Sequence, residues 1–140
     1  IDDRRGEGSA LGNLGLAYDS LGQYERAIDF HQQYLTIARE IGDRHSEGVA
    51  IANLGASEIQ LERYSDALGN SQSALEIFRE SGDRAGEAEV LKHLAELHQK
   101  LGEREQAISY CEQALAIATE LGIPLKTECE TLLSELEQSE

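Results

Sequence analysis

The sequence predicts an all-α fold in which helix pairs stack side by side as a solenoid. The first observation is a repeat, because the same residue types return every 40 positions along the 140-residue chain: Asp3, Asp43 and Asp83; Leu14, Leu54 and Leu94; Ala27, Ala67 and Ala107. The second is helical periodicity, since apolar residues recur every three or four positions within each unit and alternation of period two is absent. Units that pack only on their neighbours form a solenoid.

Each unit is predicted to contain two helices. The apolar positions of the first helix in the first unit are Ala10, Leu14, Ala17, Tyr18 and Leu21. Those of the second helix are Tyr24, Ala27, Ile28, Leu35 and Ala38. Both sets fit one face of a helix, so we expect each to face the core.

Glycines are predicted to end these helices in the left-handed conformation. The candidates are Gly22 and Gly102 after first helices, and Gly42, Gly82 and Gly122 after second helices. Glu62 takes this place in the second unit and fits it less well, because a side chain disfavours positive φ. Asp43 and Asp83 follow at positions where a carboxylate caps the next helix.

Small residues recur where the two helices of a pair are expected to cross. They are Ala27, Ala67 and Ala107 on the second helices, and Gly15, Gly55 and Ala95 on the first helices. A glycine inside a helix costs about 1 kcal/mol relative to alanine, so its repetition at one phase indicates a steric requirement.

The whole chain is predicted to be one array. Its repeats are 1–40, 41–80 and 81–120, and a terminal half-repeat occupies 121–140. Because the chain begins at Ile1 and contains no methionine, we expect it to be a fragment of a longer protein. Leu132, Leu133 and Leu136 of the terminal helix are expected to pack on the helix over 104–120 as a cap, and self-association is the alternative.

The net charge of −15, from 12 basic and 27 acidic residues, argues against binding to nucleic acids and to anionic membranes. No run of 18 apolar residues is present, and neither is a secretion signal. Two cysteines are too few for a disulfide framework, so a cytoplasmic location is expected. No cofactor motif is visible, and a Walker loop is absent.

The repeat resembles that of the tetratricopeptide repeat family. The matching residues are Leu14-Gly15, Tyr18 and Ala27; Leu54-Gly55 and Ala67; and Leu94-Ala95 and Ala107. Glu58 and His98 depart from the tyrosine that the family often has there. The 40-residue unit with its Gly-Asp-Arg junction is similar to the Pins or Leu-Gly-Asn variant. The resemblance implies a right-handed superhelix of three repeats plus a terminal helix, and a role in protein–protein interaction.

The resemblance also implies that the first helices line a concave groove for a peptide. The groove positions are Asn13, Leu16, Val49, Ala52, Asn53, Ala56, Lys92, His93 and Glu96. An amide side chain can both donate to and accept from an extended peptide backbone, so Asn13 and Asn53 are the best functional pair. The alternative is a structural hydrogen bond or simple solvation. His93 replaces the asparagine in the third repeat.

Three arginines, Arg4, Arg44 and Arg84, recur in the first turn of the first helices, where the helix dipole disfavours a cation. One explanation is an ion pair with the glutamate three residues on, as between Arg44 and Glu47. The other is a place at the groove rim, where the guanidinium would meet a carboxylate of the ligand.

No cluster of titratable or nucleophilic residues in the sequence points to a catalytic site, so we do not expect an enzyme. Glu89, His93 and Glu96 share one helix face and could contribute to a metal site, but a charged stretch of groove is favoured. Cys111 replaces an apolar residue and is expected to be buried and inert, whereas Cys129 is expected to be more accessible. The function predicted is therefore a scaffold that binds a protein or peptide partner. The alternative is a homo-oligomer assembled through the terminal helices.

Overall fold

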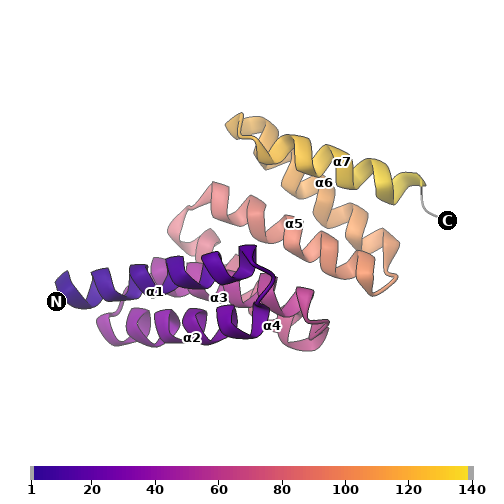
Figure 1. Cartoon of the computed structure of the whole chain (residues 1–140). Helices are drawn as coiled ribbons and strands as arrows, with labels where there is room; N and C mark the ends of the chain where they lie inside the picture. The colour runs from indigo at the N-terminus through magenta and orange to yellow at the C-terminus, as the bar shows by residue number, and fades with distance from the viewer. Residues whose placement is uncertain (1, 139–140) are drawn as a thin grey trace. The chain divides into compact units, whose positions relative to one another are not determined.

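The computed structural model describes residues 2–138, and every regular element in this part of the chain is an α-helix (Figure 1). The seven helices are α1 (Asp2–Ser20), α2 (Tyr24–Ile41), α3 (Arg44–Gln60), α4 (Tyr64–Ser81), α5 (Arg84–Lys100), α6 (Arg104–Leu121) and α7 (Leu125–Gln138). The starts of α2, α4 and α6 are spaced by 40 residues, as are those of α3 and α5. The all-α prediction and the helix-pair repeat are thus confirmed.

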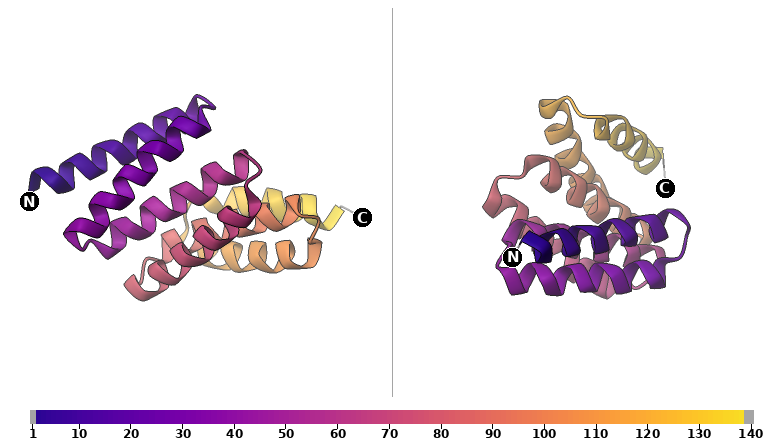
Figure 2. Two further views of the ribbon diagram at one scale, coloured as in Figure 1. Left: turned by 90° about the horizontal axis from the view of Figure 1, so that it is seen from below. Right: turned by 60° about the vertical axis from the view of Figure 1, so that its left-hand side comes forward.

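The contacts divide the chain into two compact units, residues 1–77 and residues 78–140, with the division inside α4. In the first unit α1 packs on α2 and α2 packs on α3, with a smaller contact between α1 and α3 (Figure 2). In the second unit α6 packs on both α5 and α7. Besides its part of α4, each unit therefore contains a first helix, its paired second helix and the first helix that follows.

The predicted helix ends have the predicted geometry. Gly22, Gly42, Gly82, Gly102 and Gly122 all have φ between 65° and 77°. Glu62 adopts the same conformation with φ 62°, and among the described residues it is the one non-glycine with positive φ. At the starts of α3 and α5, the carboxylates of Asp43 and Asp83 accept hydrogen bonds from the backbone amides of Ser46 and Gly86 at 3.1 and 2.8 Å.

Within the helix pairs, the small residues lie at a tight crossing. Ala27, Ala67 and Ala107 are completely buried. A Cβ atom on Gly15 would come within 2.5 Å of the His31 ring, and one on Gly55 within 2.9 Å of the Ser71 hydroxyl. In the third repeat the corresponding pair is Ala95 and Cys111, both fully buried. In the first two repeats a Cβ atom on the first helix would thus clash with the side chain that the second helix places at this crossing.

This crossing predicts a coupled mutational effect. We expect Gly15→Ala to destabilise the chain by about 1–2 kcal/mol, because overpacking against His31 outweighs the gain in helix propensity. The same substitution should cost less in a His31→Cys background, which reproduces the pairing of the third repeat. Urea unfolding of the four chains of this cycle measures the coupling. Gly6→Ala, with open space around its Cβ position, is the control and should be neutral or stabilising.

A second contact also recurs at one pair of positions in every repeat. The pairs are Tyr18 with Phe30, Glu58 with Asn70, and His98 with Tyr110. The rings of the first and third pairs stack with centroids 5.3 Å apart. Asn70 instead donates a hydrogen bond of 2.7 Å to the Glu58 carboxylate, and burial raises the pKa of Glu58. Where Glu58 takes the place of Tyr18 in the second repeat, its partner on the second helix is therefore an asparagine that can donate a hydrogen bond to it.

Helix α7 packs on α6, as expected. Leu132 and Leu136 are buried, Leu133 is half-buried, and Arg104 of α6 donates to the Leu136 carbonyl oxygen at 2.7 Å. Pro124 lies immediately before the first residue of the helix. The last two positions of the predicted half-repeat, 139 and 140, lie outside the described residues.

One core prediction is wrong at the first helix. Ala10, Leu14, Ala17 and Leu21 of α1 are exposed, although the periodicity assigned them to the core. Leu14 is 46% exposed. The equivalent face of α3 is covered because α3 packs on α2 of the repeat before it. Within the described residues no helix precedes α1, so its apolar face stays exposed.

Candidate functional site

Helix α3 is buried around most of its circumference and open along one strip. Val49, Asn53 and Ala56, spaced by four and three residues, are half-buried, while Ala52 beside them is 8% exposed. This spacing places all four on one helix face. Eight other residues of the helix are buried: Gly48, Ala50, Ile51, Leu54, Gly55, Ser57, Glu58 and Ile59. The strip is therefore the part of the α3 centre that a ligand can reach.

The first helix of the same unit contributes Asn13 and Leu16. Both are exposed, Leu16 by 48%. Neither Asn13 nor Asn53 has a side-chain hydrogen bond to another residue of the described chain. The predicted groove residues of α1 and α3 are therefore small apolar groups, one leucine and two amides, with no ionisable side chain among them.

A buried polar network that the sequence did not reveal joins α1, α2 and α3. His31 Nε2 lies 2.9 Å from one carboxylate oxygen of Asp19, and the Ser57 hydroxyl donates to the other at 2.7 Å. A carboxylate only accepts, so His31 carries its proton on Nε2. Its Nδ1 is buried without a partner. Because Asp19 lies between the serine and the histidine, the imidazole cannot activate the hydroxyl, and the network is structural.

The corresponding strip on α5 in the second unit is charged. Lys92 Nζ lies 3.3 Å from a Glu128 carboxylate oxygen of α7 and 3.8 Å from one of Glu96. These residues line an open hollow together with Thr131 and Glu135. The sequence identified Lys92 and Glu96 but missed Glu128, because nothing in the spacing shows which face of the terminal helix turns towards α5.

Burial determines the protonation of this strip. It lowers the pKa of His93 to about 4, and the neighbouring Lys92 ammonium adds to the effect. Burial raises the pKa of Glu89 and of Glu96, partly offset by Lys92. Within residues 2–138, no three histidine, cysteine or carboxylate side chains are arranged to hold a metal ion.

The recurring arginines are held by carboxylates. Arg4 pairs with Glu7 at 2.8 Å, and Arg44 pairs with Glu47 at 3.4 Å, which are the predicted partners three residues on. Arg4 also bonds Glu40 of α2. This second partner, 36 residues away, was not apparent from the sequence.

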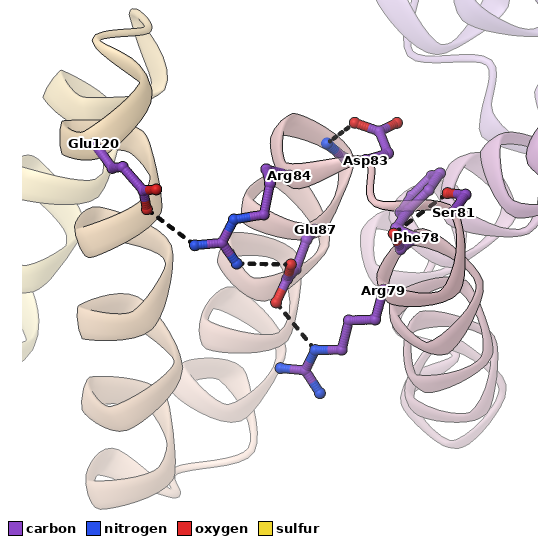
Figure 3. A network of polar contacts seen from close by, with 8 residues as sticks. Phe78, Arg79, Ser81, Asp83, Arg84, Glu87 and Glu120 are labelled. Atoms are coloured by element: carbon purple, nitrogen blue, oxygen red, sulfur yellow. Dashed lines mark hydrogen bonds and ion pairs between the residues drawn. The ribbon is translucent and has the colours of Figure 1, made fainter.

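The same arrangement recurs in the second unit as a continuous network (Figure 3). Arg84 pairs with Glu87 at 3.1 Å and with Glu120 of α6 at 3.0 Å. Glu87 also accepts from Arg79, in the last turn of α4, at 3.0 Å. Glu87 therefore links α5 to the C-terminal end of α4.

Neither cysteine is placed to act as a nucleophile. Both thiols are free and fully buried, and Cys111 Sγ donates to the Cys129 carbonyl oxygen at 3.2 Å. Burial raises the pKa of Cys111 to about 11 and also raises that of Cys129. The expected accessibility of Cys129 is therefore wrong, because α7 turns this residue towards α6.

Comparison with known proteins agrees with this architecture. Two family models, both described as Tetratricopeptide repeat, match residues 10–44 and 48–120. No curated protein sequence matches the chain. None of the described helices is long and apolar enough to cross a membrane.

Several solved structures share the fold. BtubC (BKLC) from P. vanneervenii has 24% identity and a TM-score of 0.81, over 92% of this chain and 54% of that one. The apo form of RapI has 19% identity and a TM-score of 0.85, over 94% and 48%. The chain thus spans about half the length of these two proteins.

A third similar structure is a peptide complex. The first TPR of Spaghetti (RPAP3), bound to the HSP90 peptide SRMEEVD, has 18% identity and a TM-score of 0.72, over 94% of this chain and 91% of that one. At these identities, the likeness shows a shared fold.

Proposed function

Because the chain belongs to the tetratricopeptide repeat family, we propose that it is a non-enzymatic interaction module that binds an extended peptide segment along α1 and α3. The observation that carries the proposal is the single open strip of α3, since the rest of the helix centre is buried. The peptide complex of the similar Spaghetti domain supports a peptide as the ligand class.

In the proposed complex the two amides bind the ligand backbone. Asn13 and Asn53 occupy the same position of successive repeats, so each would bond one segment of an extended main chain. Leu16, Val49 and Ala56 would contact apolar side chains of the ligand, with Ala52 at the floor. Because main-chain bonds do not read side chains, specificity would depend on these apolar contacts.

Other assignments stay predictions. The charged residues Lys92, His93 and Glu96 are proposed as a further ligand-binding stretch on the second unit. The rim role of Arg4, Arg44 and Arg84, the single array over residues 1–140 and the cytoplasmic location also stay predictions. Homo-oligomerisation through the terminal helices is the alternative function, and sedimentation over a concentration series, with and without residues 121–140, tests it.

The proposal predicts a loss of affinity when both amides are removed. A peptide selected on the wild-type chain from a displayed random library serves as the probe. We expect Asn13→Ala with Asn53→Ala to weaken its binding by roughly 5- to 150-fold, since each of the two lost hydrogen bonds is worth about 0.5–1.5 kcal/mol. Gln32→Ala, an exposed amide on α2, is the control. Unchanged affinity of the double variant would contradict the proposal.

A further inference from the structure

Asp19 is a carboxylate that is fixed in place beside the residues proposed to bind the peptide. His31 Nε2 of α2 and the Ser57 hydroxyl of α3 lie 2.9 and 2.7 Å from its two oxygens. The His31 side chain is completely buried and Ser57 is 1% exposed, whereas the Asp19 side chain is 23% exposed. Among these three side chains, the carboxylate is therefore the one that a ligand can reach.

The exposed part of this carboxylate lies next to the open residues of both helices. Asp19 follows Leu16 by three positions on α1, and Ser57 follows Asn53 by four positions on α3, so each pair shares one side of its helix. Helix α2 packs on both α1 and α3, and its His31 contacts the carboxylate from that side. The side that remains for a ligand is therefore that of the α3 strip.

The charge of the carboxylate is not balanced by its two partners. The Ser57 hydroxyl is neutral. His31 Nδ1 is buried without a partner, so a second ring proton would bury an unpaired N–H group, and the neutral imidazole fits the site. Asp19 also lies in the last turn of α1, where the helix dipole disfavours an anion and favours a cation. Both observations favour a positive charge at this point.

This carboxylate occurs in one of the three repeats. Ile59 and Gln99 occupy the position of Asp19 in the second and third repeats. Asn13 and Asn53, in contrast, recur at one position, and hydrogen bonds from them to a main chain do not distinguish one ligand residue from the next. A single charged contact would therefore fix which residue of the ligand lies between α1 and α3.

We propose that Asp19 binds the cationic side chain of one arginine or lysine of the ligand, and that this contact sets the register of the peptide. The ligand class is thus an extended peptide with a basic residue at one fixed position among apolar residues. A carboxylate that is already held by two hydrogen bonds needs no rearrangement to accept charge-assisted bonds from the ligand. This inference rests on the proposed function and adds to the structural role of Asp19.

The variant Asp19→Asn removes the charge and keeps the network. Its amide oxygen can accept from His31 Nε2, and its NH2 group can donate to the Ser57 hydroxyl. That hydroxyl then donates to the Asn53 carbonyl oxygen, 3.1 Å away. We therefore expect this variant to fold like the wild-type chain, which circular dichroism checks. Asp29→Asn, the same change at an exposed position of α2, is the matched control.

Parallel selections from one displayed random peptide library test the proposal on the full chain. We expect arginine or lysine at one fixed position of the peptides selected on the wild-type chain and on Asp29→Asn, and no such preference on Asp19→Asn. A peptide selected on the wild-type chain should bind Asp19→Asn about 10- to 100-fold more weakly, as expected for the loss of a charge-assisted hydrogen bond.

A change in the peptide tests the same contact without altering the protein. Citrulline in place of the selected arginine, or norleucine in place of a selected lysine, removes the charge and keeps most of the side chain. This peptide should bind the wild-type chain more weakly by a similar factor, and it should bind Asp19→Asn about as well as the unmodified peptide does. Selected peptides without a fixed basic position, or equal losses on both chains, would overturn the proposal.

The result can be distinguished from that of the test of the proposed function. If Asn13→Ala with Asn53→Ala weakens the peptide and Asp19→Asn does not, the proposed binding surface is supported and the register contact is wrong. If Asp19→Asn alone weakens it, the role of the two asparagines is wrong and the contact with Asp19 is supported.

Discussion

Replacing Asp19 by alanine is expected to destabilise the chain by about 2–4 kcal/mol. The carboxylate is the hydrogen-bond partner of His31, whose side chain is completely buried and whose Nδ1 already lacks a partner. Its loss leaves both imidazole nitrogens unsatisfied, and it removes one bond of the Ser57 hydroxyl. An unsatisfied buried polar group costs about 1–3 kcal/mol, which makes this small substitution a severe one.

Urea unfolding of the full chain, followed by circular dichroism, measures this effect. Asp29→Ala, at an exposed position of α2, is the control and should change the free energy of unfolding by less than about 0.5 kcal/mol. In a His31→Ser background, which reproduces Ser71 of the second repeat, Asp19→Ala should cost less. Equal losses in both backgrounds would contradict the role assigned to Asp19.

The second large effect concerns acid stability and His93. Burial holds the pKa of this imidazole at about 4 in the folded chain, compared with an ordinary value of 6.5. The unfolded chain therefore takes up this proton first as the pH falls. The stabilisation is present above pH 6.5 and is lost progressively as the pH falls from 6.5 to 4. The shift corresponds to at most about 3 kcal/mol, and the part of the ring that stays open to solvent reduces it.

The variant His93→Asn isolates this contribution, because asparagine occupies the same position in the first two repeats. The difference in unfolding free energy between the two chains should change by about 1–3 kcal/mol between pH 7 and pH 4, in favour of the variant at low pH. Comparison at equal pH cancels the opposite contributions of Glu89 and Glu96, whose raised pKa values favour folding as the pH falls. A titration midpoint of the His93 ring near 6.5 by NMR would contradict the explanation.

Much of the fold could be predicted because the residues that determine it recur in each 40-residue repeat. The glycines at the helix ends and the capping roles of Asp43 and Asp83 follow from local backbone requirements, which a single sequence displays. The exposure of Leu14 could not be obtained in this way, since periodicity gives a residue its helix face but does not say whether a neighbour covers that face.

The contacts that were missed connect different helices through side chains. Nothing in the spacing of Asp19, His31 and Ser57 shows that they meet, because their approach depends on how three helices pack. The same holds for Lys92 and Glu128, which lie 36 residues apart. Conversely, the pairing of Arg84 with Glu87 was predictable, because both lie on one helix at a separation of three residues.

The central claim is that the open strip of α3, together with Asn13 and Leu16 of α1, binds the ligand. Its most direct test is chemical-shift mapping, in which the selected peptide is titrated into the isotope-labelled full chain. We expect the largest shifts at Asn13, Val49 and Asn53, including the side-chain amides of the two asparagines. Shifts confined to the exposed faces of α2 and α6, for example at Gln32 and Gln113, with both asparagine side chains unchanged, would contradict it.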